Sequence, residues 1–406
     1  MTARPPTGAL ARCVGDAGAF LAEAFGRAPH RWRSGPFTDL LSVADVDAQL
    51  TGGGLRRPAV RLARDGEVLP ASSFTRRART GSTWIDDLVD PARTLAAFAD
   101  GATIVLNSLH RWWPPLGDFC AELERELGHP VQANAYLTPA GSAGFAPHHD
   151  THDVLVLQVE GSKHWTVREP LVDAPLERHR SDHEAAAAQP VLFDGVLEPG
   201  DALYLPRGFV HSAAAQAEAS LHLTIGILNR TRHDLLRQIV DRTADDPAFR
   251  QSLPVRFAAD ADTAQRVVKD VVADLLRWLE ALPADEVADD LVWREARRRG
   301  PRRQGQLLEL VADRPVDDAT VVVRRPGVAW RLRTRPDVGD GARVELELSD
   351  RRLDLPAAVE PALRRLLDGP PLAVGTLADL LDEGSRAVLV RRLLREGLLE
   401  RTDGRP

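Results

Sequence analysis

The chain has 406 residues, enough for two or three domains of ordinary size. Hydrophobic residues make up 44% and charged residues 27% of it, which excludes a disordered or collagen-like protein. The formal net charge of −7 provides no global basic field, so nucleic acid is not expected as a partner. The chain has two cysteines and no apolar run of the ~20 residues that a membrane span needs, which favours a cytoplasmic protein that binds no membrane.

The first 130 residues predict short helices mixed with strands. Apolar and polar residues alternate on both sides of an Asp-Gly pair, and this pattern predicts a hairpin over 58–70. An apolar run predicts a buried strand over 102–109. Segments with apolar residues at helical spacing are expected to form helices over 16–30, 43–50, 90–101 and 116–128.

From residue 131 to residue 228 the pattern changes to short strands separated by turns. Glycine and proline punctuate the apolar or alternating segments. The expected strands cover 131–138, 153–161, 163–169, 190–201, 202–208 and 220–228. Many short strands with turns between them are typical of a β-sandwich or a small β-barrel.

Two further regions follow the strand-rich segment. A helical region is expected up to about residue 311, and its best helix, 262–282, carries a wide apolar stripe from Val267 to Leu279. The stripe packs against other helices of the chain or forms a subunit interface, and the sequence leaves both open. Strands and three short helices over 320–406 suggest a winged-helix-like unit. Its near balance of basic and acidic residues favours packing or protein interaction over DNA binding.

The histidines gather in the strand-rich region, where eight of the twelve lie between His148 and His222. Residues two apart on a strand point to the same side, so His148 and Asp150 would present an imidazole and a carboxylate together. His211 follows a later strand. Two histidines and one carboxylate match the facial triad of non-haem Fe(II) oxygenases, which leaves three positions on the iron free. His152, which also lies two residues from Asp150, is the main competitor for His148.

Lys163 is one of two lysines in a chain that otherwise uses arginine, and it opens the expected strand over 163–169. A 2-oxoglutarate cosubstrate chelates iron through its keto-acid end, so its distal carboxylate needs a buried cation on a neighbouring strand. Lys163 is a candidate for that cation. The alternative is an ordinary lysine in a hairpin turn.

These motifs resemble a known family. The segments NAYLTPAGSAGFAPHHDTHDVLVLQVEGSKHW, PGDALYLPRGFVHSA and SLHLTIGI, with GATIVLNSLHRWWPP before them, are similar to the JmjC/cupin ribosomal oxygenases, which are Fe(II)- and 2-oxoglutarate-dependent protein hydroxylases. The dense part of the resemblance runs from about Gly101 to Gly226.

The resemblance implies roles for single residues. It assigns iron to His148, Asp150 and His211, and the distal carboxylate of 2-oxoglutarate to Lys163. It places Asn134 near the cosubstrate and metal, and Tyr136 toward the substrate. The chain departs from the family at Gly226, where the family often has a serine that helps to bind 2-oxoglutarate; Thr224 could supply a hydroxyl instead. His149 stands where the family often has tyrosine.

The resemblance also implies the architecture, an α+β chain built on a double-stranded β-helix of the cupin/JmjC type. We expect a catalytic domain over 1–230, a helical dimerisation region over 231–312 and a winged-helix-like domain over 313–406. The implied activity is hydroxylation, with dioxygen, of an arginine or histidine side chain of a ribosomal protein by a homodimer. The alternatives are the same chemistry on a peptide natural product or its precursor, and an inactive cupin that serves as a binding module.

Overall fold

The structure is a computed structural model and describes residues 8–142, 145–179, 182–300, 303–335 and 342–402. The chain divides into two compact units, Met1–Leu236 and Arg237–Pro406, and the division falls within helix α7 (Arg232–Asp241). Within the described ranges, no helix combines the length and the apolar character that crossing a membrane requires.

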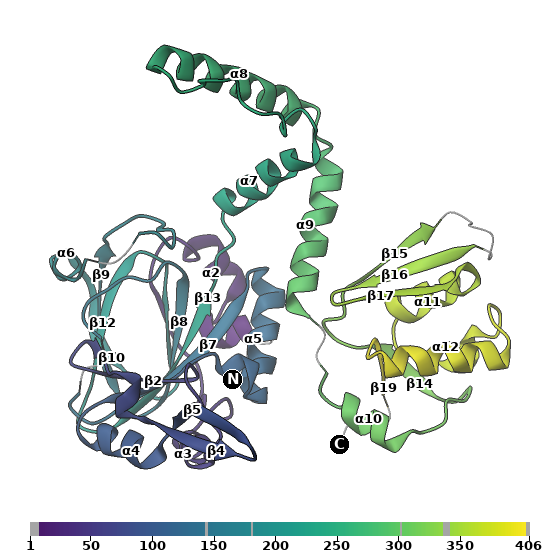
Figure 1. The fold of residues 1–406 in the computed structure, drawn as a ribbon. Helices are drawn as coiled ribbons and strands as arrows, with labels where there is room; N and C mark the ends of the chain where they lie inside the picture. Colours follow the sequence, from purple (N-terminus) through teal and green to yellow (C-terminus); the bar gives the residue numbers. More distant parts are fainter. Residues whose placement is uncertain (1–7, 143–144, 180–181, 301–302, 336–341, 403–406) are drawn as a thin grey trace. The chain divides into compact units, whose positions relative to one another are not determined.

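Two antiparallel sheets form the body of the first unit (Figure 1). The larger sheet has the strand order β1 (His30–Arg33), β11 (Asp201–Leu205), β8 (Asp153–Glu160), β13 (Ser220–Ile227), β7 (Val131–Thr138), β6 (Thr103–Leu106), β2 (Val60–Arg64) and β3 (Glu67–Val68). The smaller sheet has the order β10 (Val191–Leu197), β9 (Lys163–Pro170) and β12 (Phe209–Ala215). This arrangement confirms the expected double-stranded β-helix.

The two sheets pack face to face through apolar side chains. Val156 and Leu203 of the larger sheet meet Trp165 and Val167 of the smaller one, and these side chains are buried. On β9, buried and half-buried residues alternate, so every second side chain points into the space between the sheets. Lys163 belongs to this inward-pointing set, which places a cation inside the barrel.

Helices cover the outer face of the larger sheet and build a second, larger core there. Helix α5 (Pro114–Leu127), which is capped by Gly128 in the left-handed conformation, contributes Leu116, Phe119 and Leu123 to it. The helices of this unit are α1 (Ala9–Val14), α2 (Ala17–Glu23), α3 (Val43–Thr51), α4 (Pro91–Ala99), α5 (Pro114–Leu127) and α6 (His183–Ala187). A separate hairpin joins β4 (Thr75–Thr80) to β5 (Thr83–Val89).

The second unit has its own core and two small sheets. One sheet has the order β18 (Leu372–Ala373), β14 (Val321–Arg324) and β19 (Leu399–Arg401), and the other has β15 (Trp330–Arg335), β16 (Arg343–Leu348) and β17 (Arg352–Pro356). The helices are α8 (Ala261–Glu280), α9 (Ala284–Arg299), α10 (Gln306–Ala312), α11 (Glu360–Asp368) and α12 (Glu383–Arg395). The winged-helix description and the proposed domain boundaries stay predictions.

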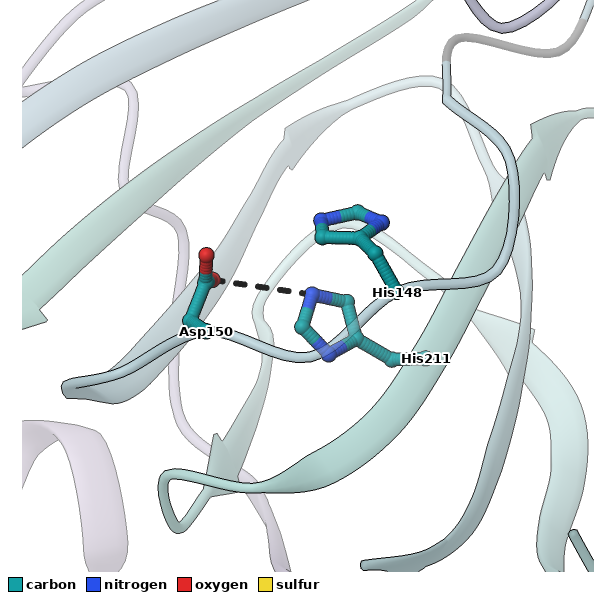
Figure 2. A group of neighbouring side chains, drawn as sticks. All are labelled: His148, Asp150 and His211. Carbon is teal, nitrogen blue, oxygen red and sulfur yellow. Dashed lines mark ion pairs between the residues drawn. The ribbon is translucent and has the colours of Figure 1, made fainter. Parts of the chain in front are cut away.

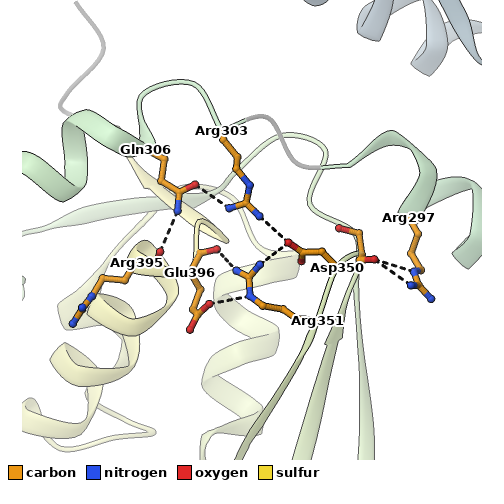
Figure 3. A network of polar contacts seen from close by, with 8 residues as sticks. Arg297, Arg303, Gln306, Asp350, Arg351, Arg395 and Glu396 are labelled. Atoms are coloured by element: carbon orange, nitrogen blue, oxygen red, sulfur yellow. Dashed lines mark hydrogen bonds and ion pairs between the residues drawn. The ribbon is translucent and has the colours of Figure 1, made fainter. Parts of the chain in front are cut away.

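A polar network joins the elements of the second unit (Figure 3). Arg351, in the turn between β16 and β17, donates through Nε to Glu396 at 2.9 Å, just after α12. Asp350, in the same turn, accepts from Arg351 at 2.7 Å and from Arg303 at 2.9 Å. Arg303 also donates to Gln306 of α10 at 3.0 Å. The network therefore holds the hairpin, α10 and the end of α12 together.

Candidate active site

The predicted iron ligands come from two neighbouring segments. His148 and Asp150 lie in the loop before β8, whereas His211 lies on β12. The expectation that His148 and Asp150 share a strand is wrong, because β8 begins only at Asp153. Pro147 has no N–H to give to a ladder, and the chain forms an isolated bridge between His148 and His211 instead. The three side chains nevertheless converge (Figure 2).

Backbone hydrogen bonds hold the two ligand segments against each other. His148 N–H donates to the His211 carbonyl at 3.2 Å, and His211 N–H donates to the His148 carbonyl at 2.8 Å. The Gly208 N–H donates to the Asp150 carbonyl at 3.0 Å. Gly208 has φ of +91°, and a Cβ there would lie 2.3 Å from the Val172 carbonyl oxygen, so the position requires glycine.

The two imidazoles are oriented by carbonyl groups. His148 Nδ1 lies 2.8 Å from the Ala146 carbonyl oxygen, and His211 Nδ1 lies 3.1 Å from that of Phe209. Because a carbonyl oxygen only accepts, each Nδ1 carries the hydrogen and each Nε2 keeps its lone pair for a metal. The His211 Nε2 atom lies 3.7 Å from Asp150 Oδ2, and one ligand atom from each of the three residues lies within 4.8 Å of the others.

The electrostatics of the group suit a cation. Burial raises the pKa of Asp150, but the surrounding imidazoles, His211 foremost, outweigh this effect and lower it below its ordinary value. Burial and the neighbouring His148 lower the pKa of His211 to about 4, against the opposing effect of Asp150. At neutral pH the carboxylate is therefore ionised and the imidazole of His211 is uncharged, which are the forms that bind metals.

Lys163 lies inside the barrel at the start of β9 and is 3% exposed. Its ammonium donates to the Thr138 hydroxyl at 3.0 Å, and Thr103 donates to the same hydroxyl. Within the described ranges, no carboxylate forms an ion pair with Lys163. Burial lowers its pKa to about 7. An enclosed cation held by a hydroxyl and free of a counter-ion is suited to receive the carboxylate of a ligand.

Several polar atoms near Lys163 are buried without a hydrogen-bond partner in the described residues. They are Gln158 Oε1, Trp165 Nε1 and His222 Nδ1. His222 lies opposite Gln158 in the sheet, and its ring packs edge-on against Trp165 with centroids 5.4 Å apart. An unsatisfied buried polar group costs about 1–3 kcal/mol, so a cluster of them indicates a place for a polar ligand.

The remaining predicted residues lie on neighbouring strands. Asn134 and Tyr136 project from β7, and Thr224 lies directly opposite Asn134 on β13. The Asn134 Oδ1 atom accepts from the Ser108 backbone N–H at 2.8 Å, which fixes the amide. Tyr136 stacks on His222 with centroids 5.0 Å apart. The structure thus brings Asn134, Tyr136 and Thr224 to the barrel face that carries His222.

The imidazole of His152 packs directly against the backbone of Gly226. A Cβ at Gly226 would lie 2.8 Å from the Cδ2 and Nε2 atoms of His152. The imidazole of His152 therefore fills the space that a larger residue at 226 would occupy. His152 lies close enough to lower the pKa of Asp150 and of His211, but it does not belong to the metal-ligating group.

Sequence reasoning missed three residues that take part in the site. Thr138 holds Lys163, and Phe145 packs edge-on against His148 with centroids 6.1 Å apart. Arg61, from β2, lies over the ring of Phe145 at 5.1 Å. Thr138 and Phe145 lie within the resemblance, where hydroxyl and aromatic residues next to the ligands are a usable signal. Arg61 lies far from the motif, and nothing in the sequence connects it to the site.

Comparisons with known proteins identify a domain family and similar proteins. Residues 115–235 match the JmjC domain family. The chain is 32% identical over 242 residues to Ribosomal oxygenase 1 of Gallus gallus, covering 56% of this chain and 39% of that protein. It is 34% identical over 236 residues to Ribosomal oxygenase 1 of Homo sapiens, covering 54% and 34%. The chain thus spans well under two thirds of the length of these relatives.

Solved structures share the fold across nearly the whole chain. The X-ray structure of E. coli ycfD gives a TM-score of 0.52 at 18% identity, covering 95% of this chain and 98% of that one. A second structure of the same protein, described as a ribosomal oxygenase in complex with cobalt and 2-oxoglutarate, gives a TM-score of 0.50 at 18% identity, with the same coverage. The chain thus carries a JmjC domain and has the double-stranded β-helix fold, and it is similar in sequence to the ribosomal oxygenases.

Proposed function

We propose that this chain is an Fe(II)- and 2-oxoglutarate-dependent oxygenase that hydroxylates an arginine or histidine side chain of a ribosomal protein. The observation that carries the proposal is the convergence of His148, Asp150 and His211 in a barrel that also buries Lys163. The names of the relatives and the cobalt and 2-oxoglutarate of the E. coli protein support it.

The metal ligands and Lys163 are proposed to bind different parts of the cofactor set, the iron ion and the distal carboxylate of 2-oxoglutarate. His148, Asp150 and His211 would hold Fe(II), and three protein ligands of this kind leave room for a cosubstrate and dioxygen. When bound, iron and 2-oxoglutarate supply, with dioxygen, the oxidation that replaces a C–H bond of the substrate by C–OH. Lys163 pairs with the distal carboxylate of 2-oxoglutarate, and Thr138 holds the ammonium in place.

The unpaired polar atoms of the barrel fit the same ligand. The N–H group of Trp165 and the imidazole of His222 have no hydrogen-bond partner among the described residues, and carboxylate oxygens accept such hydrogen bonds. Asn134 and Thr224, which lie opposite each other, are proposed to bind the cosubstrate near the metal. Tyr136 is proposed to contact the substrate.

We also propose that the protein acts in the cytoplasm as a homodimer formed through α8. The apolar stripe of that helix is exposed in the single chain, with Val268 60% and Leu276 57% accessible. A symmetric dimer would pair this stripe with itself and remove it from water.

The test is intact-mass analysis of ribosomal proteins from the source organism. They are incubated aerobically with the protein, Fe(II) and 2-oxoglutarate, while succinate is measured in parallel. The proposal expects one ribosomal protein to gain the mass of one oxygen atom, with succinate formed in equal amount and neither product with His211→Ala. Succinate without any modified ribosomal protein would refute the substrate class, and the absence of succinate would refute the oxygenase.

A further inference from the structure

A pocket of about 430 Å³ lies between α10 and α12 in the second unit. Four arginines, two acidic residues and three apolar residues line it, so its wall carries an excess of two positive charges. Among the described residues that line the pocket, none is aromatic. The pocket is separate from the metal-ligating group, whose residues all belong to the first unit.

Two of the four arginines share one carboxylate of the wall. Arg401, whose side chain is buried, donates through Nε to Glu309 Oε1 at 2.7 Å. Arg314 donates to the second oxygen of Glu309 at 3.2 Å. The carboxylate of Glu309 balances only one of these two positive charges, so it leaves no negative charge over for the remaining arginines of the pocket.

The other two arginines, Arg391 and Arg395, have no partner for their guanidinium groups within the described residues. They lie one turn apart on α12, and both are exposed. Like charges at this spacing repel each other. Arg392 of the same helix donates to Glu396 at 2.7 Å, so α12 compensates this neighbour but not the pair that lines the pocket. An anion in the pocket would relieve the repulsion.

Helix α10 adds an exposed apolar face beside these charges. Leu307, Leu310 and Val311 stand at positions i, i+3 and i+4, so they share one side of the helix. They are 71%, 45% and 76% exposed, and Leu310 lines the pocket. A helix of seven residues is marginal in water by itself, and neighbouring exposed apolar side chains indicate a surface that another molecule covers.

The backbone holds the two walls of the pocket together. Gln306 of α10 donates through Nε2 to the Arg395 carbonyl at 3.1 Å and accepts from Arg303 at 3.0 Å. Only the carbonyl of Arg395 joins this network, and its side chain extends away from it (Figure 3). The guanidinium of Arg395 is therefore left to bind a ligand while its backbone fixes the position of α10 against α12.

We propose that this pocket and the apolar face of α10 bind an acidic segment of a partner protein that also carries leucine-like side chains. Carboxylates of the partner pair with Arg391 and Arg395, and its apolar side chains cover Leu310 and its neighbours. A basic segment would be repelled by the same arginines. Nucleic acid fits less well, because the described lining has no aromatic ring on which a base could stack. The proposal is independent of the chemistry proposed for the barrel.

The test measures binding of a short labelled peptide of leucine and glutamate, with leucines at helical spacing, to the full-length protein by fluorescence anisotropy. A second peptide has glutamine in place of every glutamate. The net charge of the chain, −7, opposes binding of the acidic peptide, so a preference for it must come from a local site. At an ionic strength of about 0.1 M we expect the acidic peptide to bind at least about tenfold more tightly than the neutral one.

Charge substitutions locate the site. Arg391→Gln combined with Arg395→Gln should weaken binding of the acidic peptide at least about tenfold. The matched control combines Arg364→Gln with Arg392→Gln, because each of these arginines pairs with a glutamate one turn away and neither lines the pocket. It removes the same charge and should bind the peptide like the wild type. Since Arg391 and Arg395 have no partner, their double variant should melt no earlier than the wild type by circular dichroism.

Substitutions on α10 test the apolar part of the surface. Leu310→Ser should weaken binding of the acidic peptide and of the neutral peptide alike, because it removes apolar contact and no charge. Leu308→Ser is the matched control, since Leu308 is exposed on the same helix but does not line the pocket. Its effect on either peptide should be smaller.

The proposal is overturned if the acidic peptide binds no more tightly than the neutral one, or if Arg391→Gln with Arg395→Gln binds it like the wild type. It is also overturned if the control pair loses as much affinity, because the attraction would then be general. Tighter binding of a short RNA oligonucleotide that depends on Arg391 and Arg395 would assign the pocket to nucleic acid. If neither probe binds and the double variant has a different mass in light scattering, a second copy of the chain occupies the pocket instead.

Discussion

Lys163 couples the proposed cosubstrate binding to pH. Burial lowers the pKa of its ammonium to about 7, and only the protonated form attracts a carboxylate. We predict that the affinity for 2-oxoglutarate falls as the pH rises above 7, approaching about tenfold per pH unit between about pH 8 and pH 9. Calorimetric titration with Mn(II) present measures this dependence. An affinity that is constant between about pH 6 and pH 9 would show that another group binds the carboxylate.

The same residue gives a substitution test. A hydrogen bond to a charged group contributes about 1.5–3 kcal/mol, so Lys163→Ala should weaken 2-oxoglutarate binding by at least about tenfold and metal binding much less. Lys163→Arg should also weaken it, because the planar guanidinium is larger and demands a different geometry. Lys269→Ala, on the exposed surface of α8, is the control. If Lys163→Ala binds 2-oxoglutarate like the wild type, the cosubstrate pocket lies elsewhere.

Gly226 is a position where the structure predicts a steric penalty. Gly226→Ser would place Cβ 2.8 Å from the His152 ring, and overpacking of this kind costs about 1–3 kcal/mol. We expect Gly226→Ser to lower the free energy of unfolding, measured in denaturant, by that amount. His152→Ala in the same chain should restore most of it. Equal losses with and without His152 would show that the two side chains do not compete for space.

At the scale of elements, Tyr204 of β11 anchors the start of β8 just after the ligand loop. Its hydroxyl donates to Asp153 Oδ2 at 2.5 Å, and the Arg207 N–H donates to Asp153 Oδ1 at 2.9 Å. Tyr204→Phe leaves a buried carboxylate oxygen without its donor, so we expect a loss of about 1–3 kcal/mol in unfolding free energy and weaker metal binding. Thr51→Val removes an exposed hydroxyl and should cost far less. Unchanged stability in Tyr204→Phe would contradict this anchoring role.

The elements also show how far sequence patterns reach. Strands with a clear apolar rhythm, such as β7, β8 and β9, lie where the sequence predicts them. Strand β4 was not predictable in this way, because its residues are largely exposed and charged. Strand β12 was missed because Gly208 and a run of alanines weaken its pattern, although its backbone pairs fully with β9.

For the site, the sequence yields the residues but not their arrangement. His148, Asp150, His211 and Lys163 stand in recognisable spacing. Their convergence depends on pairing between segments about 60 residues apart, which local patterns cannot show. Arg61 enters the site through the register of β2 on β6 and of β6 on β7, and a charged residue in a strand gives no sign of such a position.

At the scale of the whole molecule, the exposed stripe of α8 predicts assembly. Val271 is 43% exposed and Leu275 is half-buried, and charging both positions should give folded monomers. Asp270→Asn, on the same helix, should leave the oligomer intact. Light scattering with circular dichroism measures both properties. A clean monomer mass for the wild type at micromolar concentration would end the dimer proposal, and unfolding of the charged variant would show that the stripe packs within one chain.

His148, Asp150 and His211 are predicted to form one iron site. The most direct test is equilibrium dialysis against Fe(II) without oxygen, with iron measured per chain in the wild type, His211→Ala and His152→Ala. The structure predicts one iron per chain in the wild type and in His152→Ala, and a large loss of iron in His211→Ala, with all three proteins folded. Iron retained at wild-type affinity by His211→Ala, or lost from His152→Ala, would contradict the assignment.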